Sequence, residues 1–362
     1  MMTVHLVVLN YNGRKLLAEC LPSLLRAAEC SRRHCELVVI DNGSIDNSVD
    51  YLRVVFPSIR VFEQPNRGLC SYNDVLAKLP GRVAILLNND IKLAEDSIDP
   101  LVDPLLAEKA PGDSACFMTA PLCRLFDGVT HEGLQAAVRW RWGLVEATAY
   151  FPGYEQASLR PGLTAAAGPV MAVDRQRFLE LGGFDPLYLP GRLEDLDFAF
   201  RGYMAGYQAR YVPQAVAYHK GQVSFNAAFG RCGSEALALR NTLLFQWKNL
   251  RRPLHVLRHV AALPARFALD CLRAPLTPKA TRWAFSRAFA AALARAGRCW
   301  RSPCPPRRSL DAERAYFRDF SAARLALNSL PNAPVSSGLA RSLPEASVES
   351  HELLATVGGP HS

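Results

Sequence analysis

The chain has 362 residues, a formal net charge of +9 and 49% hydrophobic residues. This length allows one large α/β domain with an appendage, or two domains. Its ten cysteines show no CxxC spacing, which argues against a zinc site and against a disulfide scaffold. No stretch reaches the roughly 18 consecutive apolar residues of a membrane-spanning helix, and the first residues lack the pattern of a signal peptide. We therefore expect a cytoplasmic protein.

The positive charge is concentrated in one segment. Residues 251–310 contain twelve arginines and one lysine but a single acid, Asp270, so this segment alone carries +12. The remainder of the chain sums to about −3, so it is near neutral and the basicity belongs to this one segment.

The first ninety residues alternate short apolar runs with amphipathic stretches, which predicts a βαβ succession. The expected strands are residues 4–9, 37–40, 59–62 and 83–87. The expected helices are residues 15–28, 44–56 and 71–79. Strands that are apolar throughout, with helices between them, predict a parallel sheet covered on both faces.

The chain after residue 112 is less regular. Residues 165–173 predict a strand of small residues, 174–185 a short helix ended by a glycine pair, 193–206 a helix, and 208–219 a final strand. The aromatic segment 139–153 predicts either a hairpin or a loop over the site.

Four polar segments follow the four predicted strands: NYNG at 10–13, DNGSIDNS at 41–48, EQPNRG at 63–68 and NND at 88–90. In parallel α/β sheets, ligands bind beyond the carboxyl ends of the strands. Each segment alone is compatible with an ordinary turn, because Asn, Asp and Gly favour turns. Four of them on one edge favour a polar ligand.

The segment after the first strand lacks the glycine-rich phosphate loop of dinucleotide-binding and P-loop folds. It offers Asn10 and Tyr11 instead, and a tyrosine ring provides a flat face for a nucleobase. Asp41, at the end of the second strand, provides acceptors for a base N–H or a ribose hydroxyl. The pattern indicates a nucleotide held by its base and ribose.

Seven blocks resemble the ordered motifs of glycosyltransferase family 2, in particular its bacterial rhamnosyltransferase-like branch. They are VVLNYNG, LVVIDNGSIDNS, NRGLCSYN, LLNND, GGFDPLYL, EDLDFAFR and YVPQAVAYH, and they span about residues 3–250. The resemblance implies the GT-A fold, which is Rossmann-like, with a mostly parallel sheet flanked by helices. It also implies transfer of a sugar from a nucleotide diphosphate to an alcohol.

The resemblance assigns roles to individual positions. Donor binding is expected of Asn10, Tyr11, Asp41, Asn66, Gly68, Asn73, Asn88 and Asn89. Asp90 matches the last acid of the family's DxD motif, which binds Mg²⁺ or Mn²⁺, and His219 matches a histidine that completes the metal site in some members. Asp195, with Glu194 beside it, matches the acidic pair that supplies the catalytic base. Asn88 departs from the pattern, because the family often has an acid there.

These residue types suit the chemistry. Mg²⁺ and Mn²⁺ sites need only one or two protein carboxylates when substrate phosphates supply further ligands. A single base with no evident nucleophile is consistent with an inverting single displacement. The expected donor is a UDP- or dTDP-sugar, and the expected acceptor is a polysaccharide or a lipid-linked glycan.

Structural interpretations of the same residues remain open. Glu194 and Asp195 also suit a helix N-terminus, Asp197 suits an ion pair with Arg201, and His219 suits an ordinary strand end. Asp185 is typical of a turn.

Other functions also remain open. One is a non-catalytic protein that binds nucleotide sugars or nucleic acid, and another is a sugar-phosphate nucleotidyltransferase. Arg240 and Asn241 are placed to reach a phosphate, although a solvated helical face is the simpler expectation.

The sequence divides into three predicted parts. Residues 1–225 form the catalytic domain, with a nucleotide-binding half at 1–110 and an acceptor half at 111–225. Residues 226–300 form a basic helical segment, and 301–362 a proline-rich break, a short helix and a disordered tail.

The basic helical segment mixes arginines with aliphatic residues and tryptophans, a composition typical of helices at anionic membrane surfaces. Peripheral attachment at the inner face of the plasma membrane is therefore one expectation. A subdomain packed on the catalytic body is another. Nucleic-acid binding is a third, although no nucleic-acid motif accompanies the charge.

Overall fold

A computed structural model describes residues 3–108, 114–221, 223–279, 281–303 and 310–328. The predicted tail and much of the predicted proline-rich break lie outside these residues. The description that follows concerns the unit Met1–Leu330.

The first ninety residues form the βαβ succession that the apolar pattern predicts. Its elements are β1 (Thr3–Asn10), α1 (Arg14–Cys30), β2 (His34–Asp41), α2 (Ser48–Val55), β3 (Arg60–Glu63), η1 (Gly68–Cys70), α3 (Ser71–Leu76) and β4 (Val83–Asn88). Helix α2 begins four residues later than predicted, because the N–H and hydroxyl of Ser44 bind the Asp41 carboxylate in the preceding turn.

The next part of the chain mixes short strands with short helices. Its elements are β5 (Ile91–Leu93), α4 (Ile98–Leu106), β6 (Cys116–Leu125), β7 (His131–Gly133), β8 (Ala137–Arg141), β9 (Leu144–Thr148), α5 (Tyr154–Ala157), β10 (Gly162–Leu163), β11 (Val170–Asp174), α6 (Arg175–Glu180), η2 (Pro186–Tyr188), α7 (Glu194–Met204) and β12 (Gln208–His219). The aromatic segment forms the β8–β9 hairpin, which decides between the two predictions for it.

The remainder of the described chain is helical, as its composition predicts. Its elements are α8 (Val223–Asn249), α9 (Pro253–Arg273), η3 (Ala274–Leu276), α10 (Ala284–Leu293), η4 (Ala296–Arg301), α11 (Leu310–Asp319) and α12 (Ala322–Asn328). Helix α8 is interrupted at Gly230, which has a φ of +65°. Among the described helices, none is both long and apolar enough to cross a membrane.

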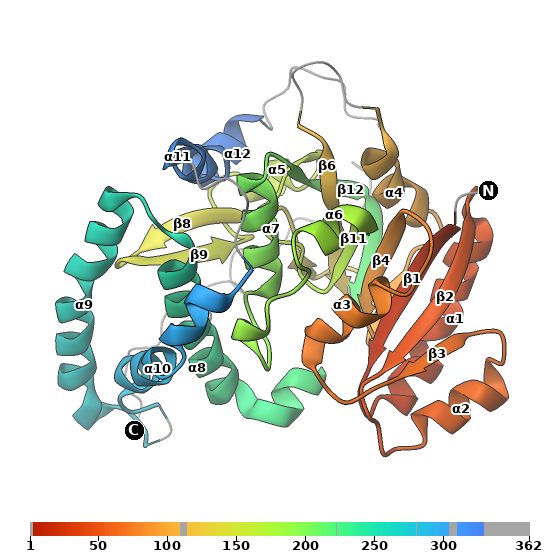
Figure 1. The fold of residues 1–362 in the computed structure, drawn as a ribbon, viewed down its shortest axis with the longest axis horizontal. Coiled ribbons are helices and arrows are strands. Elements are labelled where there is room, and N and C mark those ends of the chain that lie inside the picture. Colours follow the sequence, from red (N-terminus) through yellow and green to blue (C-terminus); the bar gives the residue numbers. More distant parts are fainter. Residues whose placement is uncertain (1–2, 109–113, 222, 280, 304–309, 329–362) are drawn as a thin grey trace. The chain divides into compact units, whose positions relative to one another are not determined.

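The main sheet has the strand order β10-β12-β6-β11-β4-β1-β2-β3 (Figure 1). Strands β4, β1, β2 and β3 are parallel, whereas β11 runs antiparallel between β4 and β6. In this register Val170 of β11 lies opposite Leu87 of β4. The segment that leads into β11 therefore lies beside the segment that leaves β4.

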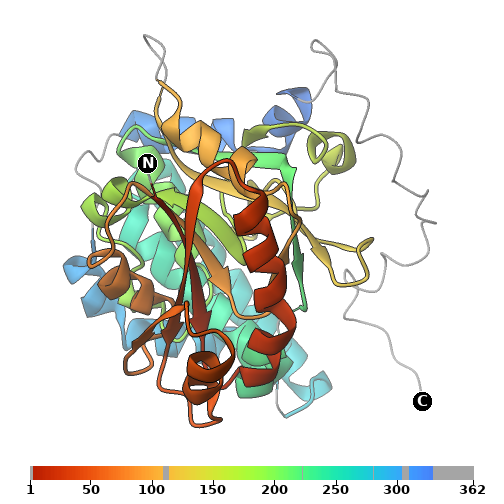
Figure 2. The same ribbon diagram turned by 90° about the vertical axis from the view of Figure 1, so that its right-hand side faces the viewer.

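Helices cover both faces of the sheet (Figure 2). Leu17 and Leu21 of α1, with Leu101 of α4, pack on one face in a cluster of buried aliphatic side chains. On the other face, α3, α6 and α7 contribute a second cluster that includes Phe178 and Phe198. The ends of the strands are left for the loops that carry the polar segments.

The C-terminal helices pack on the body through a third apolar cluster. Phe245 of α8, Phe285 of α10 and Tyr316 of α11 join Phe200 of α7 in this cluster. The rings of Phe200 and Tyr316 meet edge to face at 4.8 Å between centroids. One side of the basic helical segment is therefore an integral part of the folded unit, as the packed-subdomain interpretation requires.

Candidate active site

A buried amide at the end of β1 links two neighbouring strand ends. Asn10 Nδ2 donates to Asp41 Oδ1 at 3.0 Å, and Asn10 Oδ1 accepts from Asn89 Nδ2 at 2.9 Å. Gly13 packs so closely that a Cβ there would collide with the side chains of both Asn10 and Asn89. The ends of β1, β2 and β4 are thus connected by one hydrogen-bonded chain.

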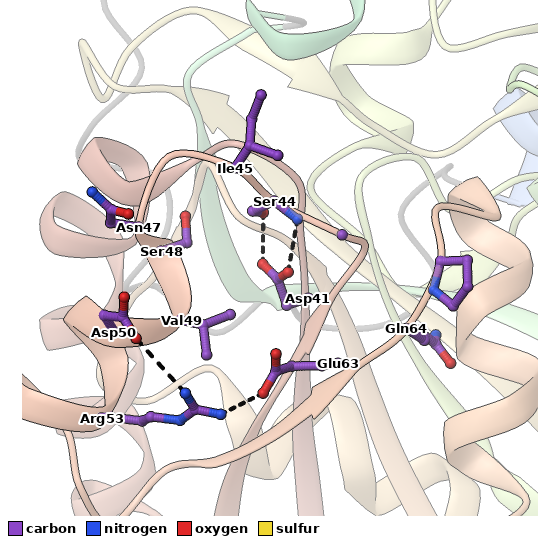
Figure 3. Close-up of a pocket in the computed structure, with 12 residues that line it drawn as sticks. Asp41, Ser44, Ile45, Asn47, Ser48, Val49, Asp50, Arg53, Glu63 and Gln64 are labelled. Carbon is purple, nitrogen blue, oxygen red and sulfur yellow. Dashed lines mark hydrogen bonds and ion pairs between the residues drawn. The ribbon is translucent and has the colours of Figure 1, made fainter.

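Asp41 ends β2 beside a cleft of about 530 Å³ (Figure 3). Its Oδ2 accepts from the backbone N–H of Ser44 at 2.8 Å, and its Oδ1 accepts from the Ser44 hydroxyl at 2.6 Å. Arg53 of α2 pairs with Glu63 at the end of β3 within the same cleft. Tyr11 lies outside the lining, with its side chain 49% exposed.

The loop after β3 carries two of the predicted donor-binding residues. Asn66 Oδ1 accepts from the Gly68 N–H at 2.9 Å, and Asn42 Nδ2 donates to the Gly68 carbonyl at 3.2 Å. Gly68 has a φ of +53°, a conformation that favours glycine. A Cβ on Gly68 would lie 3.1 Å from Leu189 and 3.2 Å from the Pro190 carbonyl. This loop therefore lies against the turn that leads into α7.

Asn73 lies on α3 as predicted, but its side chain is engaged elsewhere. Its Nδ2 donates to the Phe184 carbonyl at 2.8 Å and its Oδ1 accepts from the Phe184 N–H at 2.9 Å. The side chain of Asn73 thus joins α3 to the loop before η2, and its predicted role behind the donor loop stays a prediction. The side chain binds there because this loop leaves a backbone N–H and C=O without regular partners.

Asp90 and His219 lie close together because strand β5 begins directly after Asp90 and pairs with β12, which ends at His219. His219 lies opposite Ile91 in this pairing, and His219 Nε2 is 3.3 Å from Asp90 Oδ1. The other ring nitrogen, Nδ1, is 2.5 Å from Glu132 Oε2. Burial lowers the pKa of His219, but Asp90 and Glu132 outweigh it and raise the pKa to about 9.

Glu132 is a site residue that the sequence did not single out. It lies in the three-residue strand β7, which reaches His219 only because β7 pairs with β6 and β6 with β12. A strand this short has no periodicity to detect. Asn88, which the sequence did predict as a site residue, lies at the end of β4 opposite Leu9 of β1. Its side chain is half buried.

Glu194 begins α7 after a strained turn. Arg192 and Leu193 have φ values of +82° and +70°, a left-handed conformation that is uncommon outside glycine. Glu194 is almost completely buried. Burial raises the pKa of its carboxyl to about 8, and the charge of Asp195 acts in the same direction.

Asp195 is half buried and accepts hydrogen bonds from two segments. Its Oδ2 accepts from the N–H groups of Ala167 at 3.2 Å and Gly168 at 2.9 Å, and its Oδ1 accepts from the Leu196 N–H at 2.8 Å. Because residues 167–168 lead into β11 beside the end of β4, Asp195 shares a sheet edge with Asp90.

Asp197 is the centre of a fully buried ion cluster. Its Oδ2 accepts from Arg201 Nε at 2.7 Å, which confirms the predicted i,i+4 pair. Lys248 of α8 lies 2.9 Å from both Asp197 oxygens and 2.6 Å from Asp185 Oδ2. Burial opposes ionisation of Asp197, but Lys248 and Arg201 hold its pKa well below the usual range. Asp185 also accepts from the Leu187 N–H, as its predicted turn role requires.

Arg240 and Asn241 are not on a solvated face, contrary to expectation. Both are buried. Asn241 Nδ2 donates to the carbonyls of Tyr188 and Gly191, and Arg240 donates to that of Leu189. The turn before α7 has carbonyls without regular partners, and these two side chains satisfy them.

The chain matches known glycosyltransferases in sequence and in fold. Residues 5–143 match the family Glycosyl transferase family 2. The putative polypeptide N-acetylgalactosaminyltransferase 10 of Drosophila melanogaster is 25% identical over 147 residues, which cover 39% of this chain and 22% of the relative. The chain thus spans about a fifth of that relative.

The solved structures that are similar to the chain include two glycosyltransferase structures with TM-scores of 0.50 or more. GalNAc-T7 with UDP, GalNAc and Mn²⁺ has a TM-score of 0.51 and 22% identity, covering 68% of this chain and 48% of GalNAc-T7. Residues 1–349 of S. aureus TarS with UDP-GlcNAc have a TM-score of 0.50 and 12% identity, covering 88% and 91% of the two chains. The chain therefore spans about half of the GalNAc-T7 structure. These likenesses confirm the predicted GT-A fold.

Proposed function

We propose that this protein is a glycosyltransferase that moves a sugar from a nucleotide diphosphate to an alcohol, with inversion and with a divalent metal ion. The observation that carries the proposal is the convergence of Asp41, Asp90, His219 and Asp195 on one edge of the sheet. The match of residues 5–143 to glycosyl transferase family 2 supports it.

The donor nucleotide is assigned to the ends of β1 and β2. The Asp41 carboxylate lines the cleft, while Asn10 and Ser44 fix its orientation. The exposed ring of Tyr11 offers a stacking surface next to Asn10. The Asn66–Gly68 loop and the amides of Asn88 and Asn89 complete the donor residues in this proposal.

The metal ion is assigned to Asp90 and His219. Asp90 Oδ1 and His219 Nε2 face each other at 3.3 Å, so these two side chains would hold the ion, Asp90 as a carboxylate and His219 as a neutral imidazole. Among the described residues, no group of three or more His, Cys, Asp or Glu side chains is arranged to hold a metal. The site therefore fits an ion that takes its remaining ligands from the donor diphosphate and water. The presence of imidazole favours Mn²⁺ over Mg²⁺.

The reaction needs a base and a stabilised leaving group. The acceptor oxygen forms a bond to the anomeric carbon as the bond from that carbon to the diphosphate oxygen breaks. Asp195 accepts the proton of the acceptor hydroxyl, and the nucleoside diphosphate leaves with the electron pair. When bound, the metal neutralises charge on this leaving group. Glu194, buried with a pKa of about 8, stays protonated at neutral pH and supports the start of α7.

The proposed donor is a UDP- or dTDP-sugar, and the proposed acceptor is a polysaccharide or a lipid-linked glycan. The sequence blocks favour the bacterial rhamnosyltransferase-like branch, so dTDP-rhamnose belongs in the first donor set. GalNAc-T7 and TarS were crystallised with UDP or UDP-GlcNAc, which makes UDP-sugars the second set.

The test is a panel of UDP-, dTDP- and GDP-sugars, scored by release of nucleoside diphosphate with Mg²⁺, Mn²⁺ or a chelator. Direct binding of each nucleotide is measured in parallel. We expect release that depends on the donor, the acceptor and the metal. Nucleotide binding without release from any donor would instead identify a binding protein, and pyrophosphate release from a sugar phosphate and a nucleoside triphosphate would identify a nucleotidyltransferase.

A further inference from the structure

Helix α9 exposes a continuous apolar stripe. It consists of Leu254, Leu257, Ala261, Pro264, Ala265, Ala268 and Leu272. The three leucines of this α9 stripe are 61%, 64% and 71% exposed. Successive residues of the stripe are separated by one, three or four positions, which places all seven on one side of the helix.

The opposite side of α9 accounts for the contacts of the helix with the protein. His255 and His259 are buried there, and Leu263 and Phe267 pack against the C-terminal apolar cluster. In Figure 1, α9 stands at the edge of the drawn helices, with α8 and α10 on its inner side. The helix is thus held by one face and presents the other outward.

Helix α1 provides a comparison, because it buries its apolar side chains against the sheet. Leu17, Leu21 and Leu24 of α1 are buried against the sheet. An apolar stripe of five turns that stays outside is unusual for a soluble surface and marks a site of interaction.

Exposed cations lie on α9 and in the segment that follows it. Arg258, Arg273 and Lys279 are exposed, and none of the three forms an ion pair with a carboxylate in the part of the chain that the structure describes. Asp270, the single acid between residues 251 and 310, is engaged with the N–H groups that begin α10. The neighbourhood of the stripe is therefore strongly positive.

An exposed tryptophan lies in the β8–β9 turn, which contacts α9. Trp142 is 64% exposed, and Arg266 of α9 donates to its carbonyl at 2.6 Å. Gly143 approaches α9 so closely that a Cβ would collide with Ala262. The turn that carries the exposed Trp142 side chain is thus fixed to α9.

We propose that the α9 stripe and Trp142 form a docking surface for an anionic lipid membrane, with the leucines entering the head-group boundary. Exposed apolar side chains on α9, exposed cations on and just after this helix, and an exposed tryptophan in the adjoining turn suit such a surface, because apolar side chains bury in lipid and cations attract anionic head groups. A second copy of the chain fits less well, since it would bring two segments of charge +12 together. This inference does not depend on the proposed glycosyl transfer.

The test is co-sedimentation of the full chain with phosphatidylcholine vesicles and with vesicles that also contain phosphatidylglycerol. The stripe variant is Leu254→Glu/Leu257→Glu/Leu272→Glu. The control variant, Val54→Glu/Val129→Glu, changes residues that are 80% and 59% exposed on other elements. Because all five side chains are exposed, both variants should fold, which circular dichroism and Tm verify.

We expect the wild type and the control variant to sediment with the anionic vesicles, and the stripe variant to bind at least about tenfold more weakly. The variant Arg258→Gln/Arg273→Gln/Lys279→Gln should also bind more weakly and lose much of the salt dependence. Anionic vesicles should shift the tryptophan emission to shorter wavelength, with a smaller shift in Trp142→Phe.

The proposal is overturned if the wild type does not bind anionic vesicles, or if the stripe variant binds them as tightly as the wild type does. It is also overturned if light scattering shows that the wild type is a dimer and the stripe variant a monomer, while the wild type does not bind vesicles. That result would assign the α9 stripe to a second copy of the chain.

Discussion

The two sides of the candidate site are polar and buried, but different interactions hold them. On the donor side, hydrogen bonds connect Asn10 to Asp41 and Asn89, which follow or end adjacent strands. On the side of α7, Asp197 is held by Arg201 and Lys248 in a cluster of full charges. The donor side therefore depends on the neutral amides of the sheet, whereas the start of α7 depends on a cation from α8.

This difference has an energetic consequence. A buried charge that loses its partner costs more than a buried amide that loses a hydrogen bond, because desolvation of the charge is left uncompensated. We therefore expect the α7 side to be the less tolerant of substitution, and the following predictions test that comparison.

Asp195→Asn should have the largest effect. The amide cannot accept the acceptor proton, so transfer should fall by about 10²- to 10⁴-fold, while binding of the nucleotide, assigned to the other side, should persist. Steady-state rates and nucleotide titration measure the two quantities. Equal loss of both would place Asp195 in the fold of the donor site and not in the reaction, and Glu155→Gln on the exposed surface of α5 is the control.

Lys248→Met should destabilise the protein by about 3–5 kcal/mol, because it leaves Asp185 and Asp197 buried with less positive charge. Urea unfolding measures the free energy of unfolding. Adding Asp185→Asn to this variant should restore part of the loss, because Asp197 still pairs with Arg201 whereas the Asp185 carboxylate has lost its lysine. A Lys248→Met protein as stable as the wild type would contradict the role of this cluster.

Glu132→Gln should weaken Mn²⁺ binding by about 10- to 100-fold, the usual cost of losing a carboxylate that orients a metal-binding histidine. Calorimetric titration of Mn²⁺ in the presence of nucleoside diphosphate measures the affinity directly. Glu155→Gln again serves as the control. Unchanged Mn²⁺ affinity in Glu132→Gln would show that His219 does not need Glu132 for this task.

Asn10→Ala tests the donor side and should cost about 1–3 kcal/mol, because Asp41 and Asn89 each lose a buried hydrogen-bond partner. Urea unfolding under the conditions used for Lys248→Met gives the direct comparison between the two sides. If Asn10→Ala lowers the free energy of unfolding more than Lys248→Met does, then the expectation that the ion cluster is less tolerant of substitution than the amide network is wrong.

Glu194→Gln should have the smallest effect on sugar transfer, because the amide reproduces the neutral carboxyl, and should change chiefly the pH dependence of stability. Between the ordinary glutamate pKa and about 8, the folded carboxyl keeps a proton that the unfolded chain releases. The free energy of unfolding therefore falls as pH rises through this window, by at most about 1.4 kcal/mol per pH unit. The variant should lack this component, as unfolding from about pH 5 to about pH 9 can show. Parallel pH profiles of the two proteins would argue against a protonated Glu194.

Local pattern predicted the first half of the fold well. The apolar runs of β1, β2 and β4 specify their strands because each is buried on both faces. The polar segments that end these strands meet at one edge simply because the strands are parallel, so Asn10, Asp41 and Asn89 were identifiable. The antiparallel β11 was not, since an apolar run does not encode its direction.

Contacts between segments that are distant in the sequence could not be predicted from local pattern, and they complete the candidate site. Glu132 reaches His219 across 87 residues, and Lys248 reaches Asp197 across 51. Arg240 and Asn241 looked like surface residues because a helix in a sequence does not reveal which of its faces meets a turn with unpaired carbonyls.

By itself, the sequence determined the order of strands and helices in the first ninety residues, the polar strand ends and the basic segment, because periodicity and composition act over a few residues. Tertiary structure alone decided which charges are neutralised and which apolar face stays outside. Burial of Asp197 becomes favourable only when α8 brings Lys248, and the α9 stripe is exposed only because the opposite face already holds the helix on the body. These outcomes depend on solvent exclusion by distant parts of the chain, which no local pattern contains.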